Sequence, residues 1–475
     1  MSSIQATAAN PPEQPVSALP KTWVHGGITL VLSMLAYWLS SSNGLPAGTS
    51  WYLCLTMCAI CLWATDLMPG TIVAMMLPVA YILAGVATPD VMLKSWATPM
   101  GWLTIGGLVM GLILNHTGLA KRIALWSLMR TRGSFILLLW GLMVVGVLIT
   151  PLVPSVISKS ILMMIICMGI CDAVGFAPRS RPAATVMMVG LMAVASPRIG
   201  FYTGGGDITL PLEIMNSLGA TVTWGGYFFQ NFIPSVIYSA AVIVLIILVM
   251  RPKTDANLKD YVEKEYRALG PVSVREKRAA GYFALLVVLL FTDKYHGISP
   301  GWIMMTLAFF SFVPGLDIVD RKQAETLKLG SVFFVVGCMA IGVGAQATGL
   351  DKTLSAIMLP LLQGQSEFVT LLATYGSAVG LKFALTPVAA ASTFTAPIVE
   401  IANTLGINAK GMMYTFIYGL DQSILPYENA VYILYFATGY IKLKDFVTIT
   451  TLKAFLAIVI LAGVCYPYWK LTGAF

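Results

Sequence analysis

The sequence predicts an all-α polytopic membrane protein. Of its 475 residues, 57% are hydrophobic and only 11% are charged, and the mean hydropathy is +0.81. A soluble domain carries about 25% charged residues. A chain of this composition cannot cover itself with an ordinary polar surface, so its length is best counted in membrane spans of about 20 apolar residues each.

Charge and cysteine usage exclude several other classes of protein. The net charge is +8, but the Lys and Arg residues cluster in short loops, where the positive-inside rule accounts for them without nucleic acid. The seven cysteines lie in apolar stretches and form no disulfide framework. The three histidines are scattered, so no metal, Cys/His or Ser/His centre is expected.

The first half of the chain contains a polar tail and a series of apolar segments. Residues 1–22 are polar and rich in Pro and Ala, and we expect a cytosolic tail rather than a signal peptide. The first repeat is assigned to 23–250. Its expected spans lie near 25–40, 51–65, 70–87, 101–115, 134–150, 156–172, 183–196, 211–218 and 228–250.

A hydrophilic segment, 251–279, separates the halves, and its excess of Lys and Arg places it in the cytosol. The second repeat is assigned to 280–475. Its expected spans lie near 281–293, 300–315, 329–347, 367–384, 388–405, 410–420, 430–440 and 446–470. The chain is thus expected to be an integral, multi-pass protein of a bacterial inner membrane.

Each half contains a close apolar pair with Pro at its turn, followed by a helix interrupted by polar residues. The expected hairpins are 134–172 and 367–405, and the expected broken helices are 183–218 and 410–440. Such paired interruptions are the best sequence indication of a transporter site near the bilayer midplane. The alternative is that they are ordinary loops, which also attract Pro and Gly.

Ionisable side chains at bilayer depth are costly, so each requires a reason. Most of the candidates fall in or beside the four interruptions; they are Asp66, Lys159, Arg198, Asp207, Glu213, Lys382, Asp421 and Glu428. Arg198 is a candidate for neutralising Asp207 or Glu213 in a purely structural role.

The first hairpin turn places polar groups at the start of a helix, where free N–H groups and the helix dipole favour a carboxylate. The residues expected to bind substrate there are Ser155, Val156, Ile157, Ser158, Lys159 and Ser160. Lys159 either adds a positive charge to the site or extends to the membrane interface.

In the first broken helix, three glycines permit close backbone approach. Thr203, Gly204 and Gly205 are expected to contact substrate, and Asp207 to hold a cation or a proton.

The second hairpin turn carries Thr386, Pro387 and Val388 among small residues, with Lys382 one turn earlier. In the second broken helix, Glu428 is expected either to take a proton or to form an ion pair with Lys382 or Lys159, and the ion pair is slightly favoured.

Several stretches resemble the divalent anion:sodium symporter family of dicarboxylate, citrate and sulfate carriers. They are Leu62 to Pro69, Gly106-Gly107 with Thr117 to Ala124, Leu269 to Lys277, and Leu425 to Tyr440. The resemblance implies two inverted repeats, each with a scaffold part and a transport part. It also implies a homodimer that moves its substrate by an elevator motion.

The hairpin tips depart from the family pattern. Sodium symporters of the family carry Ser-Asn-Thr at both tips, but this chain has Ser155-Val156-Ile157 and Thr386-Pro387-Val388. Lys159 matches a position where some exchangers carry Arg, and Asn429-Ala430 matches the family's later Thr-Pro pair. We therefore expect weak or no sodium dependence, with a fixed cation such as Lys159, or a proton on Asp207 or Glu428, in place of sodium.

The sequence thus predicts a secondary transporter of small organic anions, with C4-type dicarboxylates as the expected class. A cation-independent or proton-coupled exchanger of another carboxylate or a sulfonate is the alternative. No cofactor is expected apart from Na⁺ or H⁺ as a coupling ion. A channel and a membrane-embedded enzyme are the competing classes, which counterflow and product turnover would distinguish.

Overall fold

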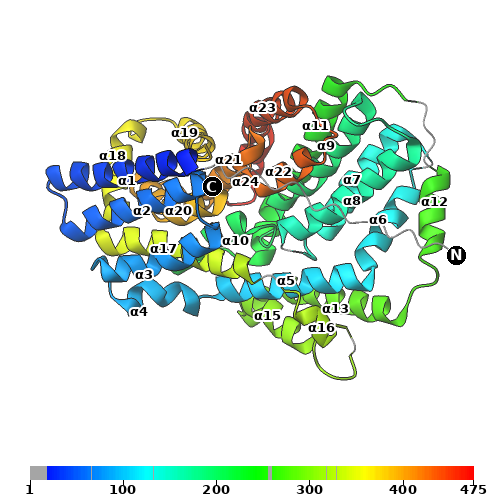
Figure 1. Cartoon of the computed structure of the whole chain (residues 1–475), viewed down its shortest axis with the longest axis horizontal. Coiled ribbons are helices and arrows are strands. Elements are labelled where there is room, and N and C mark those ends of the chain that lie inside the picture. Colours follow the sequence, from blue (N-terminus) through cyan, green and yellow to red (C-terminus); the bar gives the residue numbers. More distant parts are fainter. Residues whose placement is uncertain are drawn as a thin grey trace.

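A computed structural model describes residues 19–65, 67–131, 133–153, 155–254, 259–316, 318–327, 329–383 and 385–475, and every regular element in these ranges is a helix (Figure 1). Within them, seven helical stretches are long and apolar enough to cross a bilayer. The chain is therefore an all-α polytopic membrane protein, as predicted. Predictions for the tail before Leu19, for Asp66 and for Pro154 concern residues outside these ranges.

The helices of the first half follow the predicted segments closely. They are α1 Leu19–Ser42, α2 Ala47–Thr65, α3 Gly70–Leu83, α4 Pro89–Met92, η1 Leu93–Ala97, α5 Pro99–Thr117, α6 Leu119–Met129, α7 Phe135–Ile149, α8 Val156–Val174, α9 Arg181–Ala195, η2 Pro197–Gly200, α10 Gly206–Ser217 and α11 Trp224–Met250.

The linker and the second half are also helical. Their helices are α12 Lys259–Ala268, α13 Val274–Phe291, α14 Asp293–His296, α15 Pro300–Phe310, α16 Arg321–Ala324, α17 Gly330–Thr348, α18 Leu350–Leu362, α19 Glu367–Leu381, α20 Pro387–Leu405, α21 Ala409–Leu420, η3 Pro426–Glu428, α22 Ala430–Ala437, α23 Leu443–Ile460, η4 Leu461–Cys465 and α24 Tyr466–Leu471.

The sequence did not predict α6, α12 or α18. Helices α6 and α12 are short and carry charges, so neither has the length or the apolar character of a span. Helix α12 packs against α6, and Lys121 of α6 pairs with Glu265 of α12 at 2.9 Å. Nearby, Arg122 pairs with Glu276 at 2.6 Å. The polar linker is therefore anchored to the first half by ion pairs.

The two halves present the same order of elements. Helices α5 and α6 meet at Gly118 (φ +79°), and α17 and α18 meet at Gly349 (φ +69°), each within a Thr-Gly-Leu sequence. These left-handed conformations favour glycine, because a β-carbon is strained there. A hairpin, a broken helix and a long helix follow in each half. The inverted orientation of the halves stays a prediction.

Each hairpin turns at a hydroxyl-capped helix start. The Ser155 hydroxyl accepts from the Ser158 amide at 3.3 Å, which begins α8, and the Thr386 hydroxyl accepts from the Ala389 amide at 3.3 Å, which begins α20. Pro387 stands at the first helical position, where its fixed φ favours the helix.

The broken helices interlock the two halves. Helix α10 of the first half packs against α20 of the second, and α22 of the second half packs against α8 and α9 of the first. In Figure 1, α10 lies between the two hairpins. The extended buried core spans both halves, and a smaller apolar cluster joins α2, α3 and α17.

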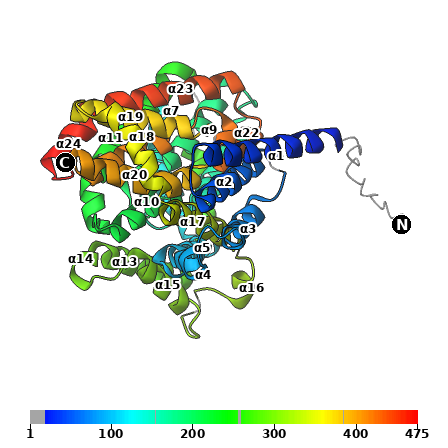
Figure 2. The ribbon, with the colours of Figure 1, turned by 90° about the vertical axis from the view of Figure 1, so that its left-hand side faces the viewer.

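Helix α1 is apolar but largely exposed. Trp23, Val31 and Trp38 each expose more than 60% of their surface. Figure 2 shows α1 extending outward from the bundle beside α2. In a bilayer, this surface is suited to contact with lipid.

Candidate functional site

Both hairpin tips and both helix breaks line one cavity of about 460 Å³. The tips contribute Ser155, Val156 and Ile157 from the first half and Thr386, Pro387 and Val388 from the second; the breaks contribute Arg198, Gly205, Gly206, Asp207, Tyr427, Glu428, Asn429 and Ala430. Helices α5 and α17 complete the wall. The structure thus brings together four stretches that are far apart in sequence.

Some predicted site residues do not line this cavity. Ser158 donates to the Ser155 hydroxyl, and Thr203 accepts from the Trp224 indole at 3.2 Å. Lys159 is 1% exposed, and its ammonium group donates to the Gly204 carbonyl at 3.0 Å. Ser160 is also buried. These four residues and Gly204 lie behind the cavity surface, so any effect of Lys159 on a bound ligand is electrostatic or passes through the glycine segment.

Arg198 is the cation at the cavity surface. Its guanidinium group forms a two-pronged pair with Asp207, at 2.6 and 2.8 Å, and a further bond to Asp421 at 2.9 Å. The predicted Arg198–Asp207 pairing is confirmed. The alternative partner, Glu213, accepts from the Tyr202 hydroxyl instead. Arg198 therefore lines the cavity and at the same time pairs with both carboxylates.

The pair continues into the second half. Lys453 of α23 is completely buried and donates to a carboxylate oxygen of Asp421 at 2.7 Å and to the Asp421 carbonyl at 3.0 Å. A chain of alternating charges therefore links α23, the second break, the first break and the start of α10. Removing one member would leave its buried partner uncompensated.

Glu428 does not pair with a lysine, so the favoured sequence prediction for it is wrong. Its two carboxylate oxygens accept from the Ile424 amide at 3.1 Å and the Leu425 amide at 2.9 Å. Lys382 donates to the Ser423 hydroxyl at 2.6 Å, and Lys159 donates to Gly204. The physical reason is local, because the break itself supplies two amides, four and three residues before Glu428, that the helix interruption leaves free.

More basic than acidic side chains are buried around the two breaks. Among the described residues around the two breaks, four buried cations (Lys159, Arg198, Lys382 and Lys453) face three buried carboxylates (Asp207, Asp421 and Glu428). Buried charge requires compensation. This arrangement favours an anion in the adjoining cavity.

The hairpin tips also differ in the donors they offer. Neither the Val156 nor the Ile157 amide donates to another described residue, as expected for the first turn of a helix. At the second tip, Pro387 has no N–H, which leaves the Val388 amide. Among the described residues, the first tip therefore leaves two backbone amides without an acceptor and the second tip leaves one.

Two kinds of residue were missed from the sequence. Thr104 lines the cavity from within α5 and Ser331 from the first turn of α17, where a hydroxyl in an apolar helix gives no distinctive signal. Lys453 was overlooked, although a lysine within the apolar stretch 446–470 was a detectable signal. Within the described residues, no group of His, Cys, Asp and Glu side chains is placed to hold a metal ion.

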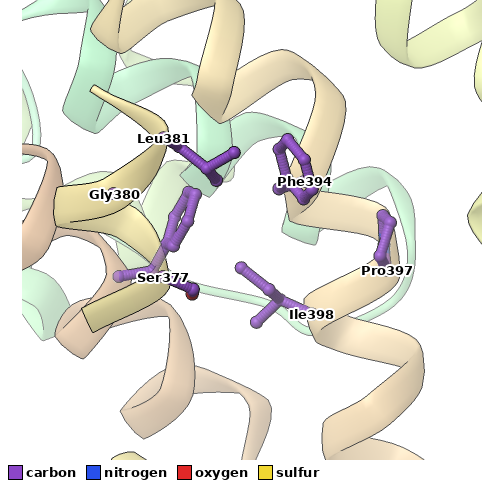
Figure 3. A pocket seen from close by; sticks show the side chains of 7 residues that line it. Ser377, Gly380, Leu381, Phe394, Pro397 and Ile398 are labelled. Carbon is purple, nitrogen blue, oxygen red and sulfur yellow. The ribbon is translucent and has the colours of Figure 1, made fainter. Parts of the chain in front are cut away.

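A second cavity, of about 320 Å³, lies between α19, α20 and α21 (Figure 3). Leu381, Phe394 and Ile398 point into it, and its hydroxyl, that of Ser377, already donates to the Thr374 carbonyl at 2.8 Å. The lining contains no charged group. This cavity does not suit a small anion, so the candidate site is the cavity at the two breaks.

Comparison with known proteins gives a family match and distant relatives. Residues 20–475 match the family described as sodium:sulfate symporter transmembrane region. A membrane protein of Cupriavidus necator is 24% identical over 73% of this chain and 72% of its own length. The L-tartrate/succinate antiporter of Escherichia coli K12 is 22% identical over 73% of both chains, and that of Shigella flexneri is 23% identical over the same shares.

Proposed function

The chain belongs to the family of the sodium:sulfate symporter transmembrane region, and from this premise we propose that it is a secondary active transporter of small organic anions, with C4-type dicarboxylates as the expected class. One observation carries the proposal: both hairpin tips and both helix breaks meet at one cavity, beside more buried basic than buried acidic side chains. The antiporters named for L-tartrate and succinate among its relatives support the dicarboxylate class.

In this proposal, the free amides of Val156 and Ile157, the Ser155 and Thr386 hydroxyls and the Arg198 guanidinium bind the anion. The hairpins and broken helices move together as a transport part against the remaining helices, within a homodimer. This elevator motion would carry the cavity across the bilayer of a bacterial inner membrane, with the linker 251–279 on the cytosolic side.

We further propose that the protein exchanges one organic anion for another without coupling to sodium. Lys159 and Lys382 each place an ammonium group on an oxygen of the break in their own half, so each break already has a cation bound. With all four buried basic groups protonated, the empty carrier would hold a surplus positive charge. Moving one elementary charge across a potential of 100 mV involves about 2.3 kcal/mol, in addition to the cost of its burial. If the carrier returns with a bound counter-anion, it avoids both the work against the membrane potential and the cost of burying an uncompensated charge.

The test is uptake of labelled succinate into proteoliposomes that are empty or loaded with unlabelled succinate, with and without a sodium gradient. We expect rapid uptake only into loaded vesicles and at most a twofold effect of sodium. Uptake that requires a fixed sodium stoichiometry would refute exchange. Non-saturable flux without counterflow would indicate a channel, and chemical conversion of the substrate would indicate an enzyme.

A further inference from the structure

Gly205 and Gly206 are adjacent in the cavity lining, which we call the cavity floor at this point, and they face two different environments. The surroundings of Gly205 are charged and those of Gly206 are apolar. A β-carbon built on Gly205 would lie 2.8 Å from the Asp207 carboxylate, 2.9 Å from the Arg198 guanidinium and 2.9 Å from the Val156 methyl group. Gly205 is therefore pressed against the ion pair.

The neighbouring position has a different environment. The nearest atoms to a β-carbon on Gly206 are methyl groups of Val388 at 3.7 Å, Met100 at 3.9 Å and Val335 at 4.0 Å. These three side chains come from α20, α5 and α17, so the apolar side is assembled from both halves. The charged and the apolar environment are one residue apart, and successive Cα atoms are about 3.8 Å apart. A ligand with a carboxylate and a short alkyl group could therefore reach both.

The rest of the lining extends this division. Leu103, Phe334 and Pro387 add to the apolar surface, and the free amides lie at the first tip. Thr104 and Ser331 also line the cavity from α5 and α17, and the Thr104 hydroxyl already donates to the Met100 carbonyl at 3.0 Å. A ligand with carboxylates separated by hydroxylated carbons would place its hydroxyls against methyl groups. Buried hydroxyls without partners are unfavourable, and buried alkyl groups are favourable.

We propose that this transporter selects organic anions with an apolar body, such as alkyl- or aryl-substituted succinates, over hydroxylated diacids such as tartrate. A carboxylate binds at Arg198 and the first tip, and the substituent packs against Val388, Val335 and Met100. This inference rests on the proposed function and names the substrate class of the same site.

The test compares exchange of labelled succinate against unlabelled methylsuccinate, 2,2-dimethylsuccinate, malate and L-tartrate in proteoliposomes. We expect half-saturating concentrations to fall roughly fourfold for each buried methyl group, as about 0.8 kcal/mol per carbon implies. We expect those for malate and L-tartrate to rise roughly tenfold for each hydroxyl, within the range for an unpaired buried polar group.

Two isosteric variants place a hydroxyl on the apolar side, Val335→Thr and Val388→Thr. Each should lower the preference for methylsuccinate over tartrate at least roughly tenfold. The matched control is Val336→Thr, because Val336 is buried one position along α17 but faces Gly101, at 3.1 Å from a β-carbon there. Its selectivity should equal that of the wild type.

Equal or better exchange of tartrate by the wild type would overturn the inference while leaving organic-anion transport intact. A change of selectivity in Val336→Thr equal to that in Val335→Thr would also overturn it, because the cavity surface would then not be the cause. Absence of counterflow with every anion would instead refute the proposed function. Size-exclusion profiles identify a variant that fails to fold. If Val335→Thr does not fold, Val388→Thr tests the same apolar side independently.

Discussion

The two helix breaks occupy matching places in the two halves but are stabilised in different ways. At the first break, Arg198 binds Asp207 from the same half and Asp421 from the other half. At the second break, Glu428 binds the amides of Ile424 and Leu425 within its own segment. The ion network joins both breaks through Asp421, and the second break has local hydrogen bonds to Glu428 in addition.

Glu428 and Asp207, the acidic residues that line the cavity at the two breaks, therefore have different roles. Both oxygens of Glu428 are used to satisfy backbone amides that the interruption leaves free, so it acts as a cap. Asp207 shares a guanidinium group with Asp421 at the cavity surface, where an incoming carboxylate would compete for the same donors. The first break is therefore the place where substrate binding can alter internal contacts.

The largest expected effect is that of Arg198→Ala. It leaves Asp207 and Asp421 short of a buried partner, and such losses cost about 3–5 kcal/mol. We expect loss of exchange and a clearly lower melting temperature in detergent. The double variant Arg198→Ala/Asp207→Asn should recover part of the melting temperature but no exchange. Full exchange by the single variant would remove the network from the mechanism.

Lys159→Ala should abolish exchange while the protein still folds. Lys159 has one hydrogen bond, to the Gly204 carbonyl, and removing a buried cation that lacks a direct carboxylate partner relieves desolvation as well as losing that bond. Exchange in proteoliposomes and the melting temperature should be measured together, with Lys382→Ala as the second-half counterpart. Wild-type exchange rates in Lys159→Ala would exclude this lysine from the site.

The adjacent glycines give a finer test of the first break. Gly205→Ala should reduce exchange by roughly tenfold or more, because its methyl group would displace the Arg198–Asp207 pair or Val156. Gly206→Ala meets only ordinary contacts of 3.7 Å and longer, so it should remain within about twofold of the wild type. Equal effects of the two substitutions on the apparent affinity would contradict the division of the cavity floor.

Glu428→Gln should have only a small effect on exchange. The amide side chain can still accept from one of the two backbone groups, so the expected loss of stability is about 1–3 kcal/mol. Exchange should stay within a few-fold of the wild-type rate, with the same dependence on pH. If the pH dependence disappeared in this variant, Glu428 would be a proton carrier rather than a cap.

The amount of the fold that could be predicted depended on how local each signal was. Apolar length located α5, α8, α17 and α20 to within a few residues, because lipid requires long uncharged helices. The Pro and Gly interruptions located both breaks for a similarly local reason. Helices α6 and α18 were missed because neither has the length of a span.

The site itself was predicted in part. Val156, Asp207, Thr386 and Asn429 do line a common cavity, since turns and breaks at bilayer depth need one. For Lys159 the sequence left two interpretations open, a charge in the site or extension to the membrane interface, but the structure buries the side chain and directs its ammonium group to the Gly204 carbonyl. Side-chain direction and partner choice depend on which helices meet, and no local pattern carries that information.

By itself, the sequence determined that lipid is the solvent, where the helices lie and where they break, because hydropathy and backbone hydrogen bonding act over short stretches of chain. Only the tertiary structure decided that Arg198 pairs with Asp421, that Lys453 completes their network and that Val388, Val335 and Met100 meet at Gly206. These contacts join residues far apart in the sequence, several of them from opposite halves, and packing determines which of the many possible buried partners come within reach.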